Sequence, residues 1–146
     1  MLRLRRSQVE EIVAHVQAEA PLEAGGLLAG HGTSVERVYA MKNADQSAVT
    51  YRLDPEEQYR VFVEIENDGR ELIGIYHSHP ESQAYPSPRD VDMSYYPEAI
   101  YLIVSLTGDG LPELRAFRIQ NGAITEEEIT ATASEADSSS HRPAAF

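Results

Sequence analysis

The stretch Glu71–Pro80, with the sequence ELIGIYHSHP, sets the expected fold around it. Its first residues, from Glu71 to His77, are mostly apolar, which is typical of a buried strand. Pro80 lacks the backbone donor that a strand needs, so the strand is expected to end there. His77 and His79 therefore lie at the end of a predicted strand, where a pocket can open beside them.

The two histidines are spaced for joint binding of one metal ion. Residues i and i+2 of a strand project from the same face about 6.6 Å apart, because each residue advances the strand by about 3.3 Å. Two imidazoles leaning together from that spacing can meet one ion at about 2.0–2.1 Å from each nitrogen. Asp90 follows thirteen residues after His77 and can return on a helix to offer a carboxylate oxygen. Three such ligands leave one tetrahedral position for water, as in a catalytic zinc site.

Each of these residues also has a purely structural interpretation. A histidine pair at the end of an apolar strand can face solvent or make ordinary hydrogen bonds. Ser87 and Asp90 fit the N-cap and third position of a short helix, where Asp90 would favour the helix dipole without any metal. Glu23 is one of 24 Asp and Glu residues. Taken one by one, these residues leave both interpretations open.

Helices and strands are predicted on both sides of this segment. Ser7 and Glu10 fit a capping box, and apolar residues follow at helical spacing up to Pro21, with His15 off the apolar stripe and expected in solvent. A second helix begins at Asp54-Pro55 and ends near Gly69, and a short third one begins at Ser87. The predicted strands span residues 25–30, 35–41, 48–53, 71–77, 99–106 and 113–119, with a last one up to about 129.

The order of these elements predicts one α/β (α+β) domain, in which a single mixed β-sheet is flanked by helices. The domain is predicted over residues 1–129. From residue 130 to 146 the chain is rich in Ala, Ser, Glu and Asp, and it is predicted to be a disordered tail.

Composition excludes several classes of protein. The 146 residues include 12 Lys and Arg against 24 Asp and Glu, a formal charge of −12, which argues against nucleic acid as a partner. No apolar run approaches the roughly 20 residues of a membrane span, and the basic start leads into a helix pattern, so no membrane is expected and the cytoplasm is the expected location. The chain has no cysteine, so a transition-metal site must use His, Asp or Glu. The sequence assigns no oligomeric state.

The His-Ser-His-Pro motif at residues 77–80, followed after six residues by Ser87 and after two more by Asp90, resembles the signature of the JAMM (MPN+) metallopeptidase family. The segment Pro21–Gly30 (PLEAGGLLAG) is similar to that family's first motif, in which a Glu, here Glu23, precedes a Gly-x-Leu-x-Gly strand. The resemblance covers roughly residues 1–129. It implies the JAMM/MPN architecture, which is cytidine-deaminase-like.

The resemblance also implies a role for each matching residue. His77, His79 and Asp90 would bind one zinc ion per chain. Glu23 would be the general base that takes a proton from the attacking water and passes it to the leaving amine. Ser87 would help to hold the water or the oxyanion of the tetrahedral intermediate.

JAMM enzymes cut amide bonds after the C-terminal tails of ubiquitin or ubiquitin-like β-grasp proteins, and members that cut polyubiquitin carry sizeable insertions around the catalytic groove. Only eight residues separate Asp90 from the strand near Ala99, so the chain is similar to the compact stand-alone prokaryotic members. Those are associated with small sulfur-carrier proteins that end in Gly-Gly. The expected function is therefore zinc-dependent hydrolysis of the amide bond after the C-terminal Gly-Gly of a ubiquitin-like sulfur carrier or its adduct.

Two alternatives remain within the same fold. Some relatives lose the ligands and serve as non-catalytic MPN-type interaction scaffolds, but this chain retains all five residues. A DNA-associated branch has a similar His-x-His-Pro block, and the acidic charge speaks against it. Other metallohydrolases fit less well, because a (β/α)₈ barrel needs about 250 residues and zinc deaminases need paired cysteines.

Overall fold

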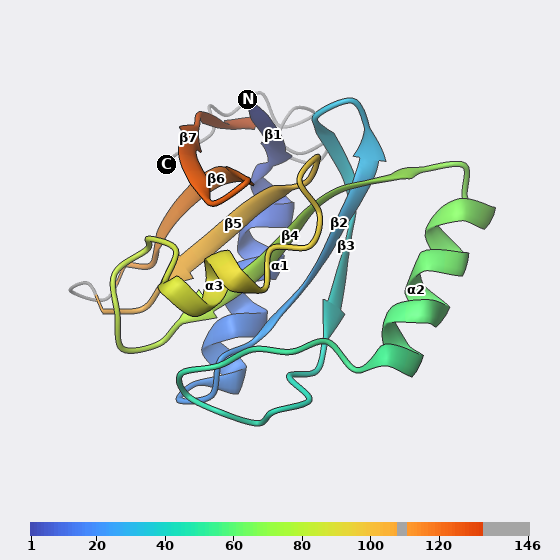
Figure 1. Cartoon of the computed structure of the whole chain (residues 1–146). Helices are drawn as coiled ribbons and strands as arrows, with labels where there is room; N and C mark the ends of the chain where they lie inside the picture. The colour runs from blue at the N-terminus through green and yellow to red at the C-terminus, as the bar shows by residue number, and fades with distance from the viewer. Residues whose placement is uncertain (108–110, 133–146) are drawn as a thin grey trace.

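The computed structural model describes residues 1–107 and 111–132 (Figure 1). These residues form an eight-stranded mixed sheet and three helices, which confirms the predicted α/β (α+β) class with a single mixed sheet. The helices are α1 (Arg6–Glu19), α2 (Pro55–Asn67) and α3 (Pro88–Asp92). The strands are β1 (Leu2–Arg5), β2 (Gly25–His31), β3 (Ser34–Met41), β4 (Glu71–His79), β5 (Ile100–Ser105), β6 (Glu113–Gln120), β7 (Ala123–Glu127) and β8 (Ile129–Thr132).

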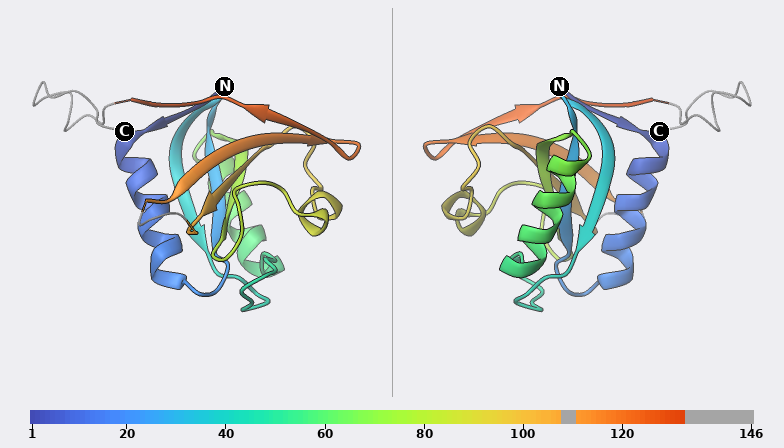
Figure 2. Two further views of the ribbon diagram at one scale, coloured as in Figure 1. Left: turned by 90° about the vertical axis from the view of Figure 1, so that its left-hand side faces the viewer. Right: turned by 90° about the vertical axis from the view of Figure 1, so that its right-hand side faces the viewer.

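The sheet separates two layers of helices. Helix α1 covers one face, whereas α2 and α3 lie on the other (Figure 2). Because side chains alternate along a strand, Tyr76 of β4 packs in the core under α1, and its neighbour Ile75 packs with Ile65 of α2. His77 and His79 share the parity of Ile75, so β4 directs them toward the face that carries α2 and α3.

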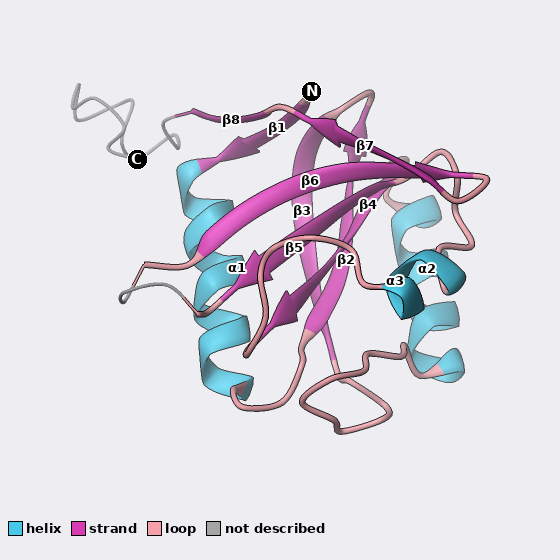
Figure 3. Cartoon of the chain, turned by 60° about the vertical axis from the view of Figure 1, so that its left-hand side comes forward, coloured by secondary structure: helices cyan, strands magenta, loops and turns pink. Residues whose placement is uncertain are grey.

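The strand order is β7-β6-β5-β4-β2-β3-β1-β8, with β4 and β5 parallel at the centre. All six residues of β5 are buried, as expected for a central strand. Strands β7 and β8 are at opposite ends of this order, yet only Glu128 separates them in the chain. The sheet therefore curves round so that its two ends meet, as Figure 3 shows.

The N-terminal prediction is wrong in two respects. Strand β1 was not expected, although Leu2 and Leu4 are almost completely buried and the strand pairs with β8. Helix α1 consequently begins at Arg6, and the side chain of Gln8, rather than Glu10, accepts a hydrogen bond (2.8 Å) from the backbone N–H of the N-cap residue Arg5. The predicted Ser7–Glu10 capping box is absent because the chain enters the helix directly from a strand.

Two further predictions need correction. Residues 48–53 do not form a strand: Leu53 makes one isolated bridge with Asn43, and the segment belongs to a loop, residues 42–53, that leads to α2. The chain after β6 forms two strands, and β8 runs to Thr132, beyond the predicted domain boundary at residue 129, because Ile129 and Ala131 pack against the core under α1. The rest of the predicted tail, residues 133–146, lies outside the described residues.

In the part of the chain that the structure describes, no helix is long and apolar enough to span a membrane.

Candidate metal centre

The end of β4 brings two imidazoles together in the interior. His77 and His79 are only 6% and 3% exposed. Their Nε2 atoms are 3.1 Å apart, and the rings meet edge-on with centroids 5.0 Å apart. Alternation along the strand produces this approach, since the intervening Ser78 faces the other way and is fully buried.

Helix α3 supplies the carboxylate. Ser87 is its N-cap: the Ser87 Oγ accepts from the N–H of Asp90 (3.1 Å), and the Ser87 N–H donates to Asp90 Oδ2 (2.9 Å). The carboxylate held in this way lies 3.2 Å from His77 Nε2 through Oδ1 and 3.0 Å from His79 Nε2 through Oδ2. Ser87 and Asp90 therefore cap the helix and also belong to the site, because the cap orients the carboxylate toward the two histidines.

The three side chains fit a metal ion. Ligand atoms of His77, His79 and Asp90 all lie within 4.8 Å of one another. His79 Nδ1 is 2.8 Å from the backbone oxygen of Gln83, which can only accept, so Nδ1 carries the proton. In a neutral ring the Nε2 lone pair of His79 then faces the carboxylate of Asp90. Such an arrangement needs a positive charge at its centre, and two imidazole nitrogens with one carboxylate oxygen are ligands typical of zinc.

The electrostatics of this cluster favour the charged carboxylate. Burial by itself would raise the pKa of Asp90, but the neighbouring imidazoles of His77 and His79, together with the hydrogen bond from the Ser87 N–H, outweigh burial and hold that pKa well below its usual range. Burial would likewise lower the pKa of His79, but the hydrogen bonds with Asp90 and with the Gln83 carbonyl raise it overall. Asp90 is therefore anionic at neutral pH and ready to bind a cation.

Glu23 lies beside the cluster, between α1 and β2. Gly25 pairs with His77, and the N–H of Ser78 donates to the backbone oxygen of Ala24 (2.8 Å), so the same register brings Glu23 level with His79. The Glu23 side chain is buried, and its Oε1 has no hydrogen-bond partner among the described residues. Burial raises the pKa of Glu23 to about 7, an effect that the nearby His77 and His79 oppose and Asp90 reinforces. A carboxyl group with this pKa can exchange a proton near neutral pH.

The loop of residues 42–53 forms one wall of the site. The ring of Tyr51 is nearly parallel to that of His77, with an interplanar angle of 8° and centroids 6.1 Å apart. Gly25 permits this approach, since a Cβ there would lie 2.9 Å from Tyr51 Cζ and 2.2 Å from the backbone oxygen of Tyr76. A residue with any side chain at position 25 would push the loop or the neighbouring strand away.

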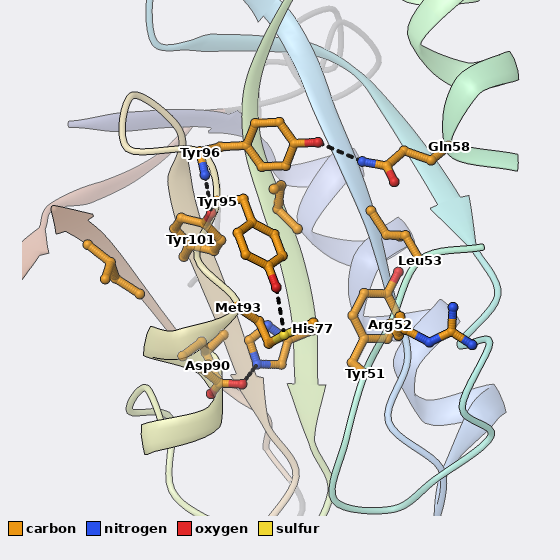
Figure 4. A pocket seen from close by; sticks show the side chains of 13 residues that line it. Tyr51, Arg52, Leu53, Gln58, His77, Asp90, Met93, Tyr95, Tyr96 and Tyr101 are labelled. Atoms are coloured by element: carbon orange, nitrogen blue, oxygen red, sulfur yellow. Dashed lines mark hydrogen bonds and ion pairs between the residues drawn. The ribbon is translucent and has the colours of Figure 1, made fainter. Parts of the chain in front are cut away.

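Beyond Tyr51, a cavity of about 190 Å³ opens beside His77 and Asp90 (Figure 4). Its walls are mainly aromatic and aliphatic, and they come from the loop, α2, α3 and the segment after it, and strands β4, β5 and β6. The lining residues are Tyr51, Arg52, Leu53, Gln58, Ile75, His77, Asp90, Met93, Tyr95, Tyr96, Tyr101, Ile103 and Ile119.

The sequence predicted part of this site. The structure brings together His77, His79, Ser87, Asp90 and Glu23, and a cavity opens beside the histidines as expected. The aromatic lining of that cavity was not predicted, because its residues come from segments that share no motif. His15 does not point into solvent as expected: its Nδ1 is 2.8 Å from the hydroxyl of Tyr76, on the face of the sheet away from the site. A helix position alone carries no signal for such a partner.

Comparison with known proteins gives consistent results. A family model described as prokaryotic homologues of the JAB domain matches residues 5–120. The CysO-cysteine peptidase of Mycobacterium tuberculosis is 41% identical over 131 residues, which cover 88% of this chain and 90% of that protein. The probable TtuB-protein conjugate cleaving protease of Thermus thermophilus is 37% identical, with 84% and 78% covered. The solution structure of a protein from Desulfitobacterium hafniense superposes with a TM-score of 0.84 at 37% identity and covers 92% of this chain and 94% of that one.

Proposed function

The chain belongs to the family of prokaryotic homologues of the JAB domain, and from this membership we propose that it is a zinc-dependent peptidase with His77, His79 and Asp90 as the metal ligands. The observation that carries the proposal is the convergence of the three ligand atoms at the end of β4, with Glu23 beside them. A non-catalytic scaffold would have no need for an unpartnered buried carboxyl at this place.

The proposed substrate is a ubiquitin-like sulfur-carrier protein with a C-terminal Gly-Gly, cut at the amide bond after the second glycine. Two relatives support this class, since one is named for a CysO–cysteine adduct and the other for conjugates of TtuB. The chain also spans 90% of the first of these relatives, so it has the same compact size. The proposed catalytic domain is residues 1–129, completed by the rest of β8, and the proposed location is the cytoplasm.

Each side chain then has a defined task. When bound, zinc supplies Lewis acidity, which polarises a carbonyl and brings the pKa of water toward about 7. Glu23 accepts the proton of the attacking water and delivers it to the leaving amine, for which a pKa of about 7 is well suited. Ser87 fixes Asp90 through two hydrogen bonds, while its own hydroxyl proton remains free to stabilise the oxyanion.

The test uses a β-grasp carrier extended by one residue after its C-terminal Gly-Gly, followed by intact mass. Wild-type protein loaded with zinc is expected to release the extension. Cleavage should disappear with a chelator, return when zinc is added back, and be lost in Glu23→Gln with zinc still bound. Cleavage that persists in the presence of chelator would contradict the role of the metal, and cleavage at another bond would contradict the substrate class.

A further inference from the structure

The position of the Glu23 carboxyl is set through its backbone. No described residue hydrogen-bonds its Oε1, so no partner of that oxygen anchors the side chain. The backbone of Glu23, in contrast, is held at both ends: its N–H donates to the oxygen of Ser47 (2.7 Å), and its own oxygen accepts from Asn43 Nδ2 (3.1 Å). Both partners belong to the loop of residues 42–53.

Asn43 organises that loop as well. Its Nδ2 also donates to the backbone oxygens of Thr50 (2.7 Å) and Ser47 (3.3 Å), while its Oδ1 accepts from the N–H groups of Asp45 (2.9 Å) and Arg52 (3.2 Å). The Nδ2 contacts are all carbonyl oxygens and the Oδ1 contacts are all N–H groups, which fixes the orientation of the amide. Asn43 is only 8% exposed, so water does not replace these bonds readily.

The opposite side of the same segment is tied to the ligand strand. Next to Glu23, the N–H of Ala24 donates to Ser78 Oγ (2.9 Å), and the N–H of Ser78 donates back to the oxygen of Ala24 (2.8 Å). Ser78 lies between His77 and His79. Strand β4 therefore sets where Ala24 lies relative to the metal ligands, and Asn43 sets where Glu23 lies relative to Ala24.

From this geometry we propose that Asn43 is a positioning residue, which holds the backbone of Glu23 so that the carboxyl reaches the reacting water. The inference rests on the proposed function, in which Glu23 is the base. Proton transfer requires heavy atoms within about 2.6–3.2 Å, and a misplacement of about 1 Å can cost 10²-fold in rate. Loss of the hydrogen bond from Asn43 to the backbone oxygen of Glu23 would allow a displacement of this size, because no hydrogen bond to Oε1 holds the carboxyl in place.

The test compares Asn43→Ala and Asn43→Ser with wild type in single-turnover cleavage of the extended carrier, with the zinc content and KM measured alongside. Serine retains an acceptor for the N–H of Asp45 and keeps the loop turn, but it is too short to reach Glu23, so it serves where alanine does not fold. The matched control is Gln8→Ala, which removes another buried amide with two backbone hydrogen bonds, to Arg5 and Val35, far from the site.

Both Asn43 variants are expected to cleave about 10-fold or more slowly, with one zinc per chain and a KM within about 2-fold of wild type. Gln8→Ala should lose stability but cleave within about 2-fold of wild type. In a Glu23→Asp background, where the carboxyl is already displaced, the Asn43 substitutions should cost less than about 3-fold, because residues that act through one group are not additive.

Unchanged cleavage in the Asn43 variants, loss of zinc from them, or an equal cost in both Glu23 backgrounds would overturn the role of Asn43. In any of these cases the proposed function would still stand if the wild type cleaves the carrier and Glu23→Asp cleaves it much more slowly. Equal cleavage by wild type and Glu23→Asp would show that the position of the carboxyl does not limit the rate, and it would overturn the inference. Full cleavage by Glu23→Gln would instead overturn the assignment of the base.

Discussion

Replacement of Glu23 by glutamine should make the zinc-stripped protein more stable, with a pH dependence that follows from burial. Burial raises the pKa of Glu23 from an ordinary 4.5 to about 7. At about 1.4 kcal/mol per pKa unit, that difference corresponds to roughly 3 kcal/mol of unfolding free energy. Because the folded-state pKa is raised, the folded protein binds the proton more tightly than the unfolded chain, and wild type loses this stability as the pH rises from about 4.5 to about 7. Above pH 7 the loss is complete.

The assay is urea unfolding of chelator-treated wild type and Glu23→Gln at pH 4.5 and pH 8. At pH 4.5 the folded wild type carries a neutral carboxyl, and the two proteins should differ little. At pH 8 the variant should be more stable by roughly 3 kcal/mol, or on the order of 10 °C in Tm for a chain of this size. This expectation would be refuted if the two proteins differed equally in unfolding free energy at both pH values, or if the variant were less stable at pH 8. Either result would mean that ionisation of the buried Glu23 carboxyl is not costly.

Three further substitutions test other parts of the structure. His77→Ala should purify without zinc, as measured by elemental analysis, because two ligands cannot replace three; full occupancy would overturn the ligand assignment. Tyr51→Phe should raise the unfolding free energy by about 1 kcal/mol, since the Tyr51 hydroxyl is buried without a hydrogen-bond partner in the described part of the chain; lower stability in urea unfolding would contradict this. Gly25→Ala should lower the unfolding free energy by about 3 kcal/mol or more, because its Cβ would lie 2.2 Å from the backbone oxygen of Tyr76. The control is Gly32→Ala, where the Cβ would enter open space. At its φ of 62° this substitution should cost only about 1–2 kcal/mol in the same assay.

Local pattern predicted β4 and the approach of His77, His79 and Asp90, whereas their assignment as metal ligands came from the resemblance to the JAMM family. Alternation along one strand places His77 and His79 on one face, and a helix start places Asp90 after Ser87, so both features depend on neighbours in sequence. The predicted convergence of the three side chains agrees with their geometry. Their binding of zinc stays a prediction.

The loop of residues 42–53 could not be predicted in the same way. Its last residues, Tyr51-Arg52-Leu53, have the composition of a strand, yet among the described residues they make only the isolated bridge between Leu53 and Asn43. The conformation comes from Asn43, whose side chain contacts the backbone at residues 23, 47, 50 and 52. Side-chain bonds to backbone groups up to 20 residues away leave no periodic signal.

Strand β1 was missed for a related reason. It has four residues, and its partner β8 begins at Ile129, at the other end of the described chain. A short strand of this kind is specified by the tertiary fold, because it forms between β3 and β8, whose residues lie far from it in the sequence. His15 is a parallel case, since its partner Tyr76 comes from β4.

The most direct test of the central claim, that His77, His79 and Asp90 hold a zinc ion, is a crystal structure of the zinc-loaded protein with anomalous scattering measured on both sides of the zinc absorption edge. We expect one peak per chain, present only above the edge, at about 2.0–2.2 Å from the Nε2 atoms of His77 and His79 and from an oxygen of Asp90. A site without such a peak in zinc-loaded crystals, or a peak bound by other residues, would contradict it.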